Sequence, residues 1–138
     1  MTSEPLFSER VVRSYELDSF GHVNNAVYLQ YCEGARNDYL KQKGIRFSDF
    51  QRWNKGPFLY QAALNYKRPV FAEDILRIEG QIRFQRPTGF RIDHVMSRIS
   101  DGKTVCSAAL DFAFVDLATQ KPCRVPPPFL EAFRPETQ

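Results

Sequence analysis

A carboxylate, an imidazole and two asparagines gather within a short stretch of this chain, directly before a segment with helical periodicity. Asp18 lies four residues before His22, with Gly21 between them, and Asn24 and Asn25 follow at once. Asparagine is favoured at the start of a helix, where backbone N–H groups lack an intrahelical acceptor and carry partial positive charge. A carboxylate beside such N–H groups suits acyl transfer. The carboxylate supplies or activates an oxygen nucleophile, and the N–H groups stabilise an oxyanion.

The helix that must position these groups is predicted over residues 25–43. Its apolar residues recur at steps of one, three and four, which is typical of a helix that buries one broad stripe. Gly44 follows as a C-terminal cap, and a helix of this length extends ~28 Å, enough to cross a sheet. The apolar positions are Val27, Tyr28, Tyr31, Cys32, Ala35, Tyr39 and Leu40.

Strands are expected before and after this helix in the sequence. The first covers residues 7–17 and ends at the turn that contains Asp18, and a short helical turn is expected at 48–53. Alternating or strongly apolar runs, joined mostly by tight turns, predict four more strands. These strands cover residues 58–67, 76–84, 90–99 and 104–116. One antiparallel sheet with one dominant helix defines an α+β fold, and residues 1–138 are expected to form a single domain.

The last strand and the tail differ from the other segments. Residues 104–116 are apolar at most positions, so both faces of this strand are expected to be covered. The proline-rich run 122–128 is expected to be stiff and extended, and the tail after it a short helix or disordered.

Composition excludes several classes of protein. The net charge is +3, from 19 basic and 16 acidic residues spread along the chain, so nucleic-acid binding is not indicated. Cys32, Cys106 and Cys123 lie far apart, which indicates a reducing, cytoplasmic compartment. The first residues lack a signal-peptide pattern and no stretch approaches the ~20 apolar residues of a membrane span, so no membrane partner is expected. With two separated histidines and no phosphate-binding glycine loop, neither a metal nor a cofactor is expected.

These residues together resemble a known family, the hotdog-fold acyl-CoA thioesterases of the 4-hydroxybenzoyl-CoA thioesterase-like group. The motif reads Asp18-x-x-Gly21-His22-Val-Asn-Asn25-x-x-Tyr28, with Glu33-x-x-Arg36 further along the helix. The sequences Tyr-Lys-Arg-Pro at 66–69 and Glu-Asp-Ile-Leu at 73–76 resemble the family's entry into its third strand. The resemblance spans residues 7–128. It implies a hotdog fold, in which a curved five-stranded antiparallel sheet wraps around one long central helix.

The resemblance implies that Asp18 is the catalytic carboxylate of an acyl-CoA thioesterase, acting as nucleophile or as general base on water. It also implies that a backbone N–H at or next to Asn25 polarises the thioester carbonyl, and His22 is a candidate helper. The acyl-CoA substrate is then expected to lie at a subunit interface of a homodimer or homotetramer. A thiolate leaves without a strong acid, so one carboxylate and a helix N-terminus are sufficient for the chemistry.

Four further residues are candidates for substrate binding. Tyr28 lies on the apolar stripe and is either core or a pocket wall. Glu33 is either a second active-site carboxylate or the ion-pair partner of Arg36, three residues later. Arg86 stands where related proteins place basic residues against CoA phosphates, and Arg124 is added on charge alone.

Other interpretations of the same residues remain. Asp18 taken alone is more typical of a turn, while Cys32 is expected to pack and His94 to be structural. A thioesterase acting on acyl carrier protein shares the His-Val-Asn-Asn stretch, but such enzymes usually have asparagine where this chain has Phe20, which favours CoA. A non-catalytic acyl-CoA-binding module is the third alternative, and retention of Asp18 speaks against it.

Overall fold

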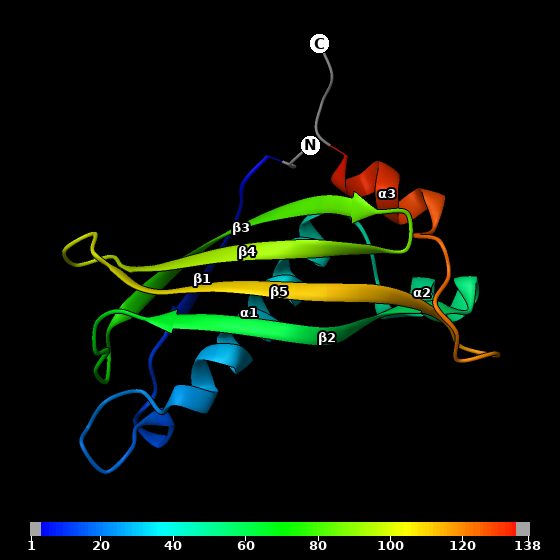
Figure 1. Ribbon diagram of the computed structural model, residues 1–138. Helices are drawn as coiled ribbons and strands as arrows, with labels where there is room; N and C mark the ends of the chain where they lie inside the picture. The colour runs from blue at the N-terminus through cyan, green and yellow to red at the C-terminus, as the bar shows by residue number, and fades with distance from the viewer. Residues whose placement is uncertain (1–3, 135–138) are drawn as a thin grey trace.

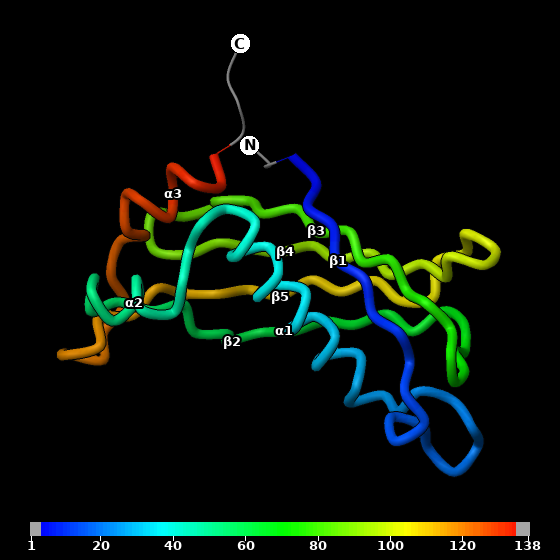
Figure 2. Tube along the Cα trace, turned by 180° about the vertical axis from the view of Figure 1, so that it is seen from behind, coloured from blue at the N-terminus to red at the C-terminus, as the bar shows by residue number. Residues whose placement is uncertain are grey.

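The computed structural model describes residues 4–134, which form one antiparallel sheet with a long helix against one face (Figures 1 and 2). The strands lie in the order β1-β3-β4-β5-β2, so β1 and β2 are the two edges. The elements are β1 (Leu6–Val11), a 3-10 turn η1 (Ser14–Glu16), α1 (Asn25–Gln42), α2 (Phe47–Trp53), β2 (Lys55–Tyr66), β3 (Ile75–Arg86), β4 (Gly89–Arg98), β5 (Thr104–Asp116) and α3 (Pro127–Phe133). The predicted α+β architecture is confirmed.

Helix α1 forms as its sequence predicts. The Asn24 side chain caps its start by accepting the Ala26 N–H at 2.9 Å, and Gly44, at φ +74°, follows its end. All seven predicted apolar positions are buried against the sheet. Gly80 on β3 allows the close approach of the helix, because a Cβ there would lie 2.5 Å from the ring of Tyr39. The helix is therefore fixed closely against the sheet, and its first turn is held in place.

The three inner strands, β3, β4 and β5, bury the face that packs against α1, and the outer face is partly open. Leu76 and Ile78 of β3 and Leu110 of β5 are buried under the helix. The prediction that both faces of β5 are covered is only partly correct, since several of its outward residues are half-buried. Asp111 on that face is buried because Arg91 of β4 binds it through two hydrogen bonds, at 2.7 and 2.9 Å. This carboxylate is covered by a cross-strand ion pair rather than by an apolar layer.

Strand β2 is an edge whose two faces are both open. Its sequence alternates between two sets of side chains, but residues 58–63 are exposed throughout. Phe58, Leu59 and Tyr60 are 47%, 40% and 54% exposed, and the register with β5 shifts between Leu59 and Gln61. A long apolar edge strand with unpaired backbone groups is a template for pairing with another strand.

The first strand is shorter than the predicted 7–17. It ends at Val11, although the Val12 N–H still donates to the carbonyl of Asp74 at 2.9 Å and so continues the pairing with the residues just before β3. The chain then forms η1, so the approach to Asp18 is a tight turn and not a strand.

The proline-rich tail agrees with the prediction in part, since the expected short helix is present but begins within the proline run. Pro127 and Pro128 begin α3 instead of continuing an extended run, since proline tolerates the first turn of a helix, where its missing N–H leaves no bond unmade. Phe129 and Phe133 of α3 are buried in the aromatic core, where Phe129 packs on Phe114 at a ring distance of 5.0 Å. Within residues 4–134, none of the helices is long and apolar enough to cross a membrane.

Candidate active site

Asp18 lies in a loop that closes on itself. Leu17 and Val23 pair as an isolated antiparallel bridge, and Asp18 N–H donates to the His22 carbonyl at 2.7 Å. Gly21 takes φ +79°, a conformation that glycine adopts without strain, and its N–H donates to the Asp18 carbonyl at 3.1 Å. Backbone hydrogen bonds therefore fix residues 17–23 independently of any substrate.

The two oxygens of the Asp18 carboxylate have different surroundings. Oδ1 accepts the backbone N–H groups of Phe20 at 2.9 Å and His22 at 3.2 Å. Oδ2 makes no hydrogen bond within residues 4–134. The first oxygen orients the side chain, and the second is available for chemistry.

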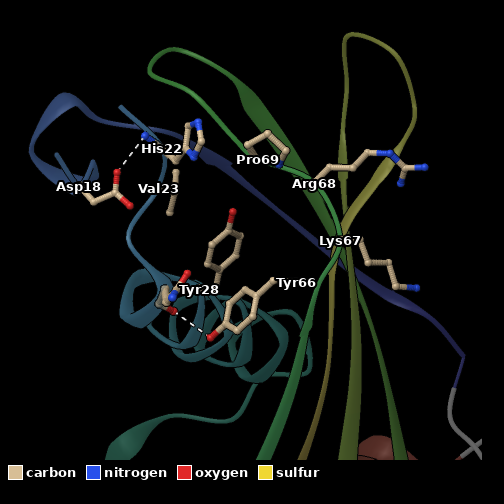
Figure 3. A pocket seen from close by; sticks show the side chains of 9 residues that line it. Asp18, His22, Val23, Tyr28, Tyr66, Lys67, Arg68 and Pro69 are labelled. Atoms are coloured by element: carbon tan, nitrogen blue, oxygen red, sulfur yellow. Dashed lines mark hydrogen bonds between the residues drawn. The ribbon is translucent and has the colours of Figure 1, made fainter. Parts of the chain in front are cut away.

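The carboxylate borders a pocket of about 310 Å³ at the end of the sheet where β2 ends (Figure 3). One wall comes from the closed loop, a second from the first turn of α1, and a third from the segment that follows β2. The lining residues are Asp18, His22, Val23, Asn25, Tyr28, Tyr66, Lys67, Arg68 and Pro69. The structure thus brings four predicted site residues together: Asp18, His22, Asn25 and Tyr28.

The N–H of Asn25 is left unused by the helix cap. The side chain of Asn24 accepts a hydrogen bond from the N–H of Ala26, and its backbone carbonyl accepts one from the N–H of Val27, both at 2.9 Å. Asn25 is the first helical residue, so its own N–H has no intrahelical acceptor. The hydroxyl of Tyr66 in β2 donates a hydrogen bond to the carbonyl of Asn25 at 3.1 Å. This bond fixes the first turn of α1 against the end of the strand.

Tyr28 places a hydroxyl inside the pocket. Figure 3 shows it pointing from α1 into the space between Val23 and Pro69, and the ring packs edge-on against Tyr66 at 5.2 Å. This hydroxyl has no hydrogen-bond partner in the described part of the chain. Burial, followed by the nearby Cys106, Tyr66 and Asp18, raises the pKa of Tyr28 to about 12. The hydroxyl therefore remains a hydrogen-bond donor at neutral pH.

His22 contacts Asp18 through its backbone rather than its imidazole. The ring lies edge-on to Phe71, with centroids 5.2 Å apart, and makes no hydrogen bond among residues 4–134. Its side chain forms a wall of the pocket, and its N–H helps to hold the carboxylate.

Glu33 and Arg86 do not lie in this pocket within one chain. Glu33 forms an ion pair with Arg36, the alternative that the sequence left open, and its side chain is largely exposed. Arg86 is at the other end of the sheet, where its guanidinium bonds the Tyr60 hydroxyl and, with Arg124, lines a separate cavity of about 510 Å³. Neither residue lies beside Asp18 within one chain, and their roles in substrate binding remain predictions.

Cys32 and His94 are structural, as expected. Cys32 is fully buried, and burial raises the pKa of its thiol to about 12. His94 is buried beneath α1 with its Nδ1 3.2 Å from the Tyr39 hydroxyl. Burial, followed by the charge of Arg36, lowers the pKa of His94 to about 4, so its ring is neutral at pH 7. Residues 4–134 contain no cluster of side chains suited to bind a metal ion.

Sequence reasoning missed the third wall of the pocket. The sequence indicates only a strand entry at Tyr66, Lys67 and Arg68, and nothing in their spacing relates them to a loop some forty residues earlier. The side chains of Lys67 and Arg68 extend away from Asp18 (Figure 3), and Arg68 donates to the carbonyl of Thr104 at 2.5 Å. They make the outer side of this end of the sheet basic.

A curved antiparallel sheet around one long helix, with a carboxylate loop at the start of that helix, defines a hotdog-fold protein. Residues 12–133 match the thioesterase-like superfamily, and the chain belongs to this superfamily. The predictions of the hotdog fold and of a thioester hydrolase are thereby confirmed.

Individual relatives agree with this assignment. The chain is 34% identical over 114 residues to the long-chain acyl-CoA thioesterase FadM of Escherichia coli (strain K12), covering 80% of this chain and 83% of FadM. It is 27% identical over 118 residues to the chloroplastic acyl-acyl carrier protein thioesterase ATL3 of Arabidopsis thaliana, covering 86% of this chain and 62% of that protein. The crystal structure of Slr0204, a 1,4-dihydroxy-2-naphthoyl-CoA thioesterase from Synechocystis, matches with a TM-score of 0.89 at 20% identity, covering 94% and 96% of the two chains.

Proposed function

We propose that this enzyme hydrolyses acyl-CoA thioesters to the free acid and CoA, with Asp18 as the reacting group. The observation that carries the proposal is the unequal environment of the Asp18 carboxylate. Oδ1 accepts hydrogen bonds from two backbone N–H groups, and Oδ2 accepts none within residues 4–134. Asp18 lines a pocket that the first turn of α1 also lines. The similarity to FadM supports CoA as the carrier of the acyl group.

The reaction begins at Oδ2 in either role of the carboxylate. As a general base, Oδ2 takes a proton from water while the oxygen of that water attacks the acyl carbon; as a nucleophile, it attacks that carbon itself. In both cases the carbonyl oxygen gains negative charge, and the C–S bond then breaks to release the thiolate of CoA. Because a thiolate is a good leaving group, the site needs no strong acid.

Two donors are available for the developing oxyanion. The N–H of Asn25 is unused by the helix and carries part of the positive end of the helix dipole. The Tyr28 hydroxyl is protonated and unpartnered in the same pocket. Removing one oxyanion donor from other acyl-transfer enzymes slows turnover ~100- to 1000-fold. We assign His22 to the pocket wall and to the support of Asp18, without proton transfer by its ring.

The substrate site is proposed to be completed by a second copy of the chain. The open edge of β2 can pair with the same edge of another copy about a two-fold axis, which sets the Tyr66 end of one strand beside the Lys55 end of the other. Arg86 lies at the Lys55 end of the sheet, because in the strand register Arg86 is opposite Gly89, Gly89 opposite Ala113, and Ala113 opposite Phe58.

The second copy would thus bring Arg86 and Arg124 toward the mouth of the Asp18 pocket, where basic groups can bind the phosphates of CoA. Further pairing of such dimers gives the proposed homotetramer. The described cysteines form no disulfide, which supports the proposed cytoplasmic location.

A panel of thioesters tests the reaction class and the carrier together. The purified protein is incubated with aliphatic and aromatic acyl-CoAs of several sizes and with the same acyl groups on acyl carrier protein, and thiol release is measured. Release from CoA esters in preference to the carrier-protein esters is expected. Release from carrier-protein esters alone would assign the other carrier. Binding of several acyl-CoAs without any thiol release would identify a binding module and refute hydrolysis.

A further inference from the structure

We infer that the hydrogen bond between Tyr31 and Glu16 is a positioning contact that sets the Asp18 loop against the start of α1. The inference rests on the proposed function of Asp18, and neither residue of this pair lines the pocket. Tyr31 and Glu16 are therefore positioning residues and not catalytic ones.

The loop that carries Asp18 is joined to the rest of the chain through a narrow stem. Glu16 and Asn24 form this stem, with the Asn24 N–H donating to the Glu16 carbonyl at 2.9 Å. Beyond it, residues 17–23 satisfy many of their polar groups internally, through the Leu17–Val23 bridge and the bonds around Asp18. Such a unit can keep its own shape and still shift as a whole, so its position depends on a few external contacts.

On the side of the loop that precedes Asp18, the external contact is made by the Glu16 side chain. Its Oε1 accepts the Tyr31 hydroxyl at 2.8 Å and the backbone N–H of Arg13 at 2.8 Å. Tyr31 is only 3% exposed, so its ring is fixed in the core of the protein. Burial, followed by the hydrogen bond to Glu16, raises the pKa of Tyr31 well above its usual value, and the hydroxyl remains a donor.

The same bond relates the two groups that must act together. Glu16 lies two residues before Asp18, and Tyr31 lies six residues after Asn25 on the same rigid helix. On its other side the loop is held by the Val23 N–H, which donates to the carbonyl of Val70 at 2.9 Å, and this contact does not involve α1. The Tyr31–Glu16 bond is thus a side-chain hydrogen bond that ties the residues just before Asp18 to the helix that carries the Asn25 N–H.

Loss of the bond is expected to slow the reaction more than it weakens the protein. A displacement of ~1 Å at a reacting group costs on the order of 100-fold in rate. Because the Val23 contact and the stem remain, Tyr31→Phe is expected to lower kcat about 10-fold while KM stays within about twofold. Glu16→Gln keeps an acceptor oxygen for the Tyr31 hydroxyl and should retain most of the activity that Glu16→Ala loses.

Tyr39→Phe is the matched control. Tyr39 lies on the same helix and is fully buried, and its hydroxyl is 3.2 Å from Nδ1 of His94, remote from the Asp18 pocket. Both substitutions remove one buried hydroxyl and its hydrogen bond. Tyr39→Phe is expected to lower the melting temperature without lowering kcat. Equal losses of kcat in the two variants would mean that global stability is responsible, and would overturn the inference.

Amide hydrogen exchange tests the position of the loop without reference to activity. The N–H groups of Asp18, Gly21 and Val23 are expected to exchange faster in Tyr31→Phe than in the wild type, and at the wild-type rate in Tyr39→Phe. Unchanged exchange and unchanged kcat in Tyr31→Phe would refute the positioning role. A wild-type protein without thioesterase activity would refute the proposed function, and the exchange rates would still decide whether the bond positions the loop.

Discussion

Replacing Asp18 by asparagine separates its chemistry from its structural role. The amide oxygen of asparagine can still accept the N–H groups of Phe20 and His22, which Oδ1 accepts at 2.9 and 3.2 Å. The loop therefore keeps its shape, while the negative charge and the free oxygen Oδ2 are lost. A positioned base or nucleophile of this kind contributes ~100- to 10,000-fold in rate. At ~1.4 kcal/mol per tenfold, this corresponds to about 3 to 5 kcal/mol of transition-state stabilisation.

Asp18→Ala provides the structural comparison. It removes the acceptor of both N–H groups, and one of these bonds is exposed enough for water to replace it. At ~0.5 to 1.5 kcal/mol for each bond, the alanine variant should lose about 1 to 2 kcal/mol of stability, or about 4 to 8 °C in Tm. Both variants are expected to lose the same activity, but only the alanine variant should melt early.

The assay follows thiol release with the best acyl-CoA of the substrate panel. Cys123 is only half-buried, so its thiol can react with the reagent that detects free CoA. The signal of each variant without substrate is therefore measured and subtracted as background. An Asp18→Asn variant within about threefold of the wild-type kcat/KM would refute the assignment of Asp18. A loss of Tm in Asp18→Asn equal to that in Asp18→Ala would show that asparagine does not preserve the loop.

Three other predictions concern the donor, the buried histidine and the open edge. Tyr28→Phe should lower kcat about 10-fold at unchanged Tm if its hydroxyl serves the oxyanion, and single-turnover kinetics measure this directly. Because the folded pKa of His94 is about 4 and its ordinary value 6.5, the unfolded chain takes up the proton first as pH falls. The free energy of unfolding is therefore unaffected by His94 above pH 6.5 and falls by about 3 kcal/mol as the pH is lowered toward 4. In His94→Gln, the free energy of unfolding measured with urea should change less over this pH range. Phe58→Glu should shift the protein toward monomer in sedimentation analysis, since it places a charge on the exposed apolar edge of β2.

The sequence predicts those parts of the fold that depend on local patterns. The stripe from Val27 to Leu40 matches the buried face of α1, because helical periodicity and burial have the same cause. The alternation in β2 does not correspond to a buried face, since residues 58–63 are exposed on both faces of this strand. The early end of β1 reflects the turn η1 at Ser14–Glu16, where Glu16 accepts the hydroxyl of Tyr31 fifteen residues away, a contact that no local pattern contains.

The candidate site was predictable to the same degree. Asp18, His22, Asn25 and Tyr28 are close in sequence, so one loop and one helical turn keep them together. Tyr66 is brought to the same pocket only by the pairing of β2 in the sheet, and its bond to Asn25 is a tertiary contact. The separation of Arg86 from this pocket also follows from strand order, which residue types alone do not reveal.

Because the two oxygens of Asp18 have different surroundings, isotope incorporation into this carboxylate can show whether it acts as the nucleophile. Where Asp18 acts as the nucleophile, Oδ2 becomes the bridging atom of a mixed anhydride, and water that attacks the Asp18 carbon replaces that atom. Because Oδ1 stays bound to the N–H groups of Phe20 and His22, each cycle in isotopically heavy water exchanges the same position. The peptide containing Asp18 should then gain one heavy oxygen and no more, however many turnovers occur. A carboxylate free to rotate would gain two.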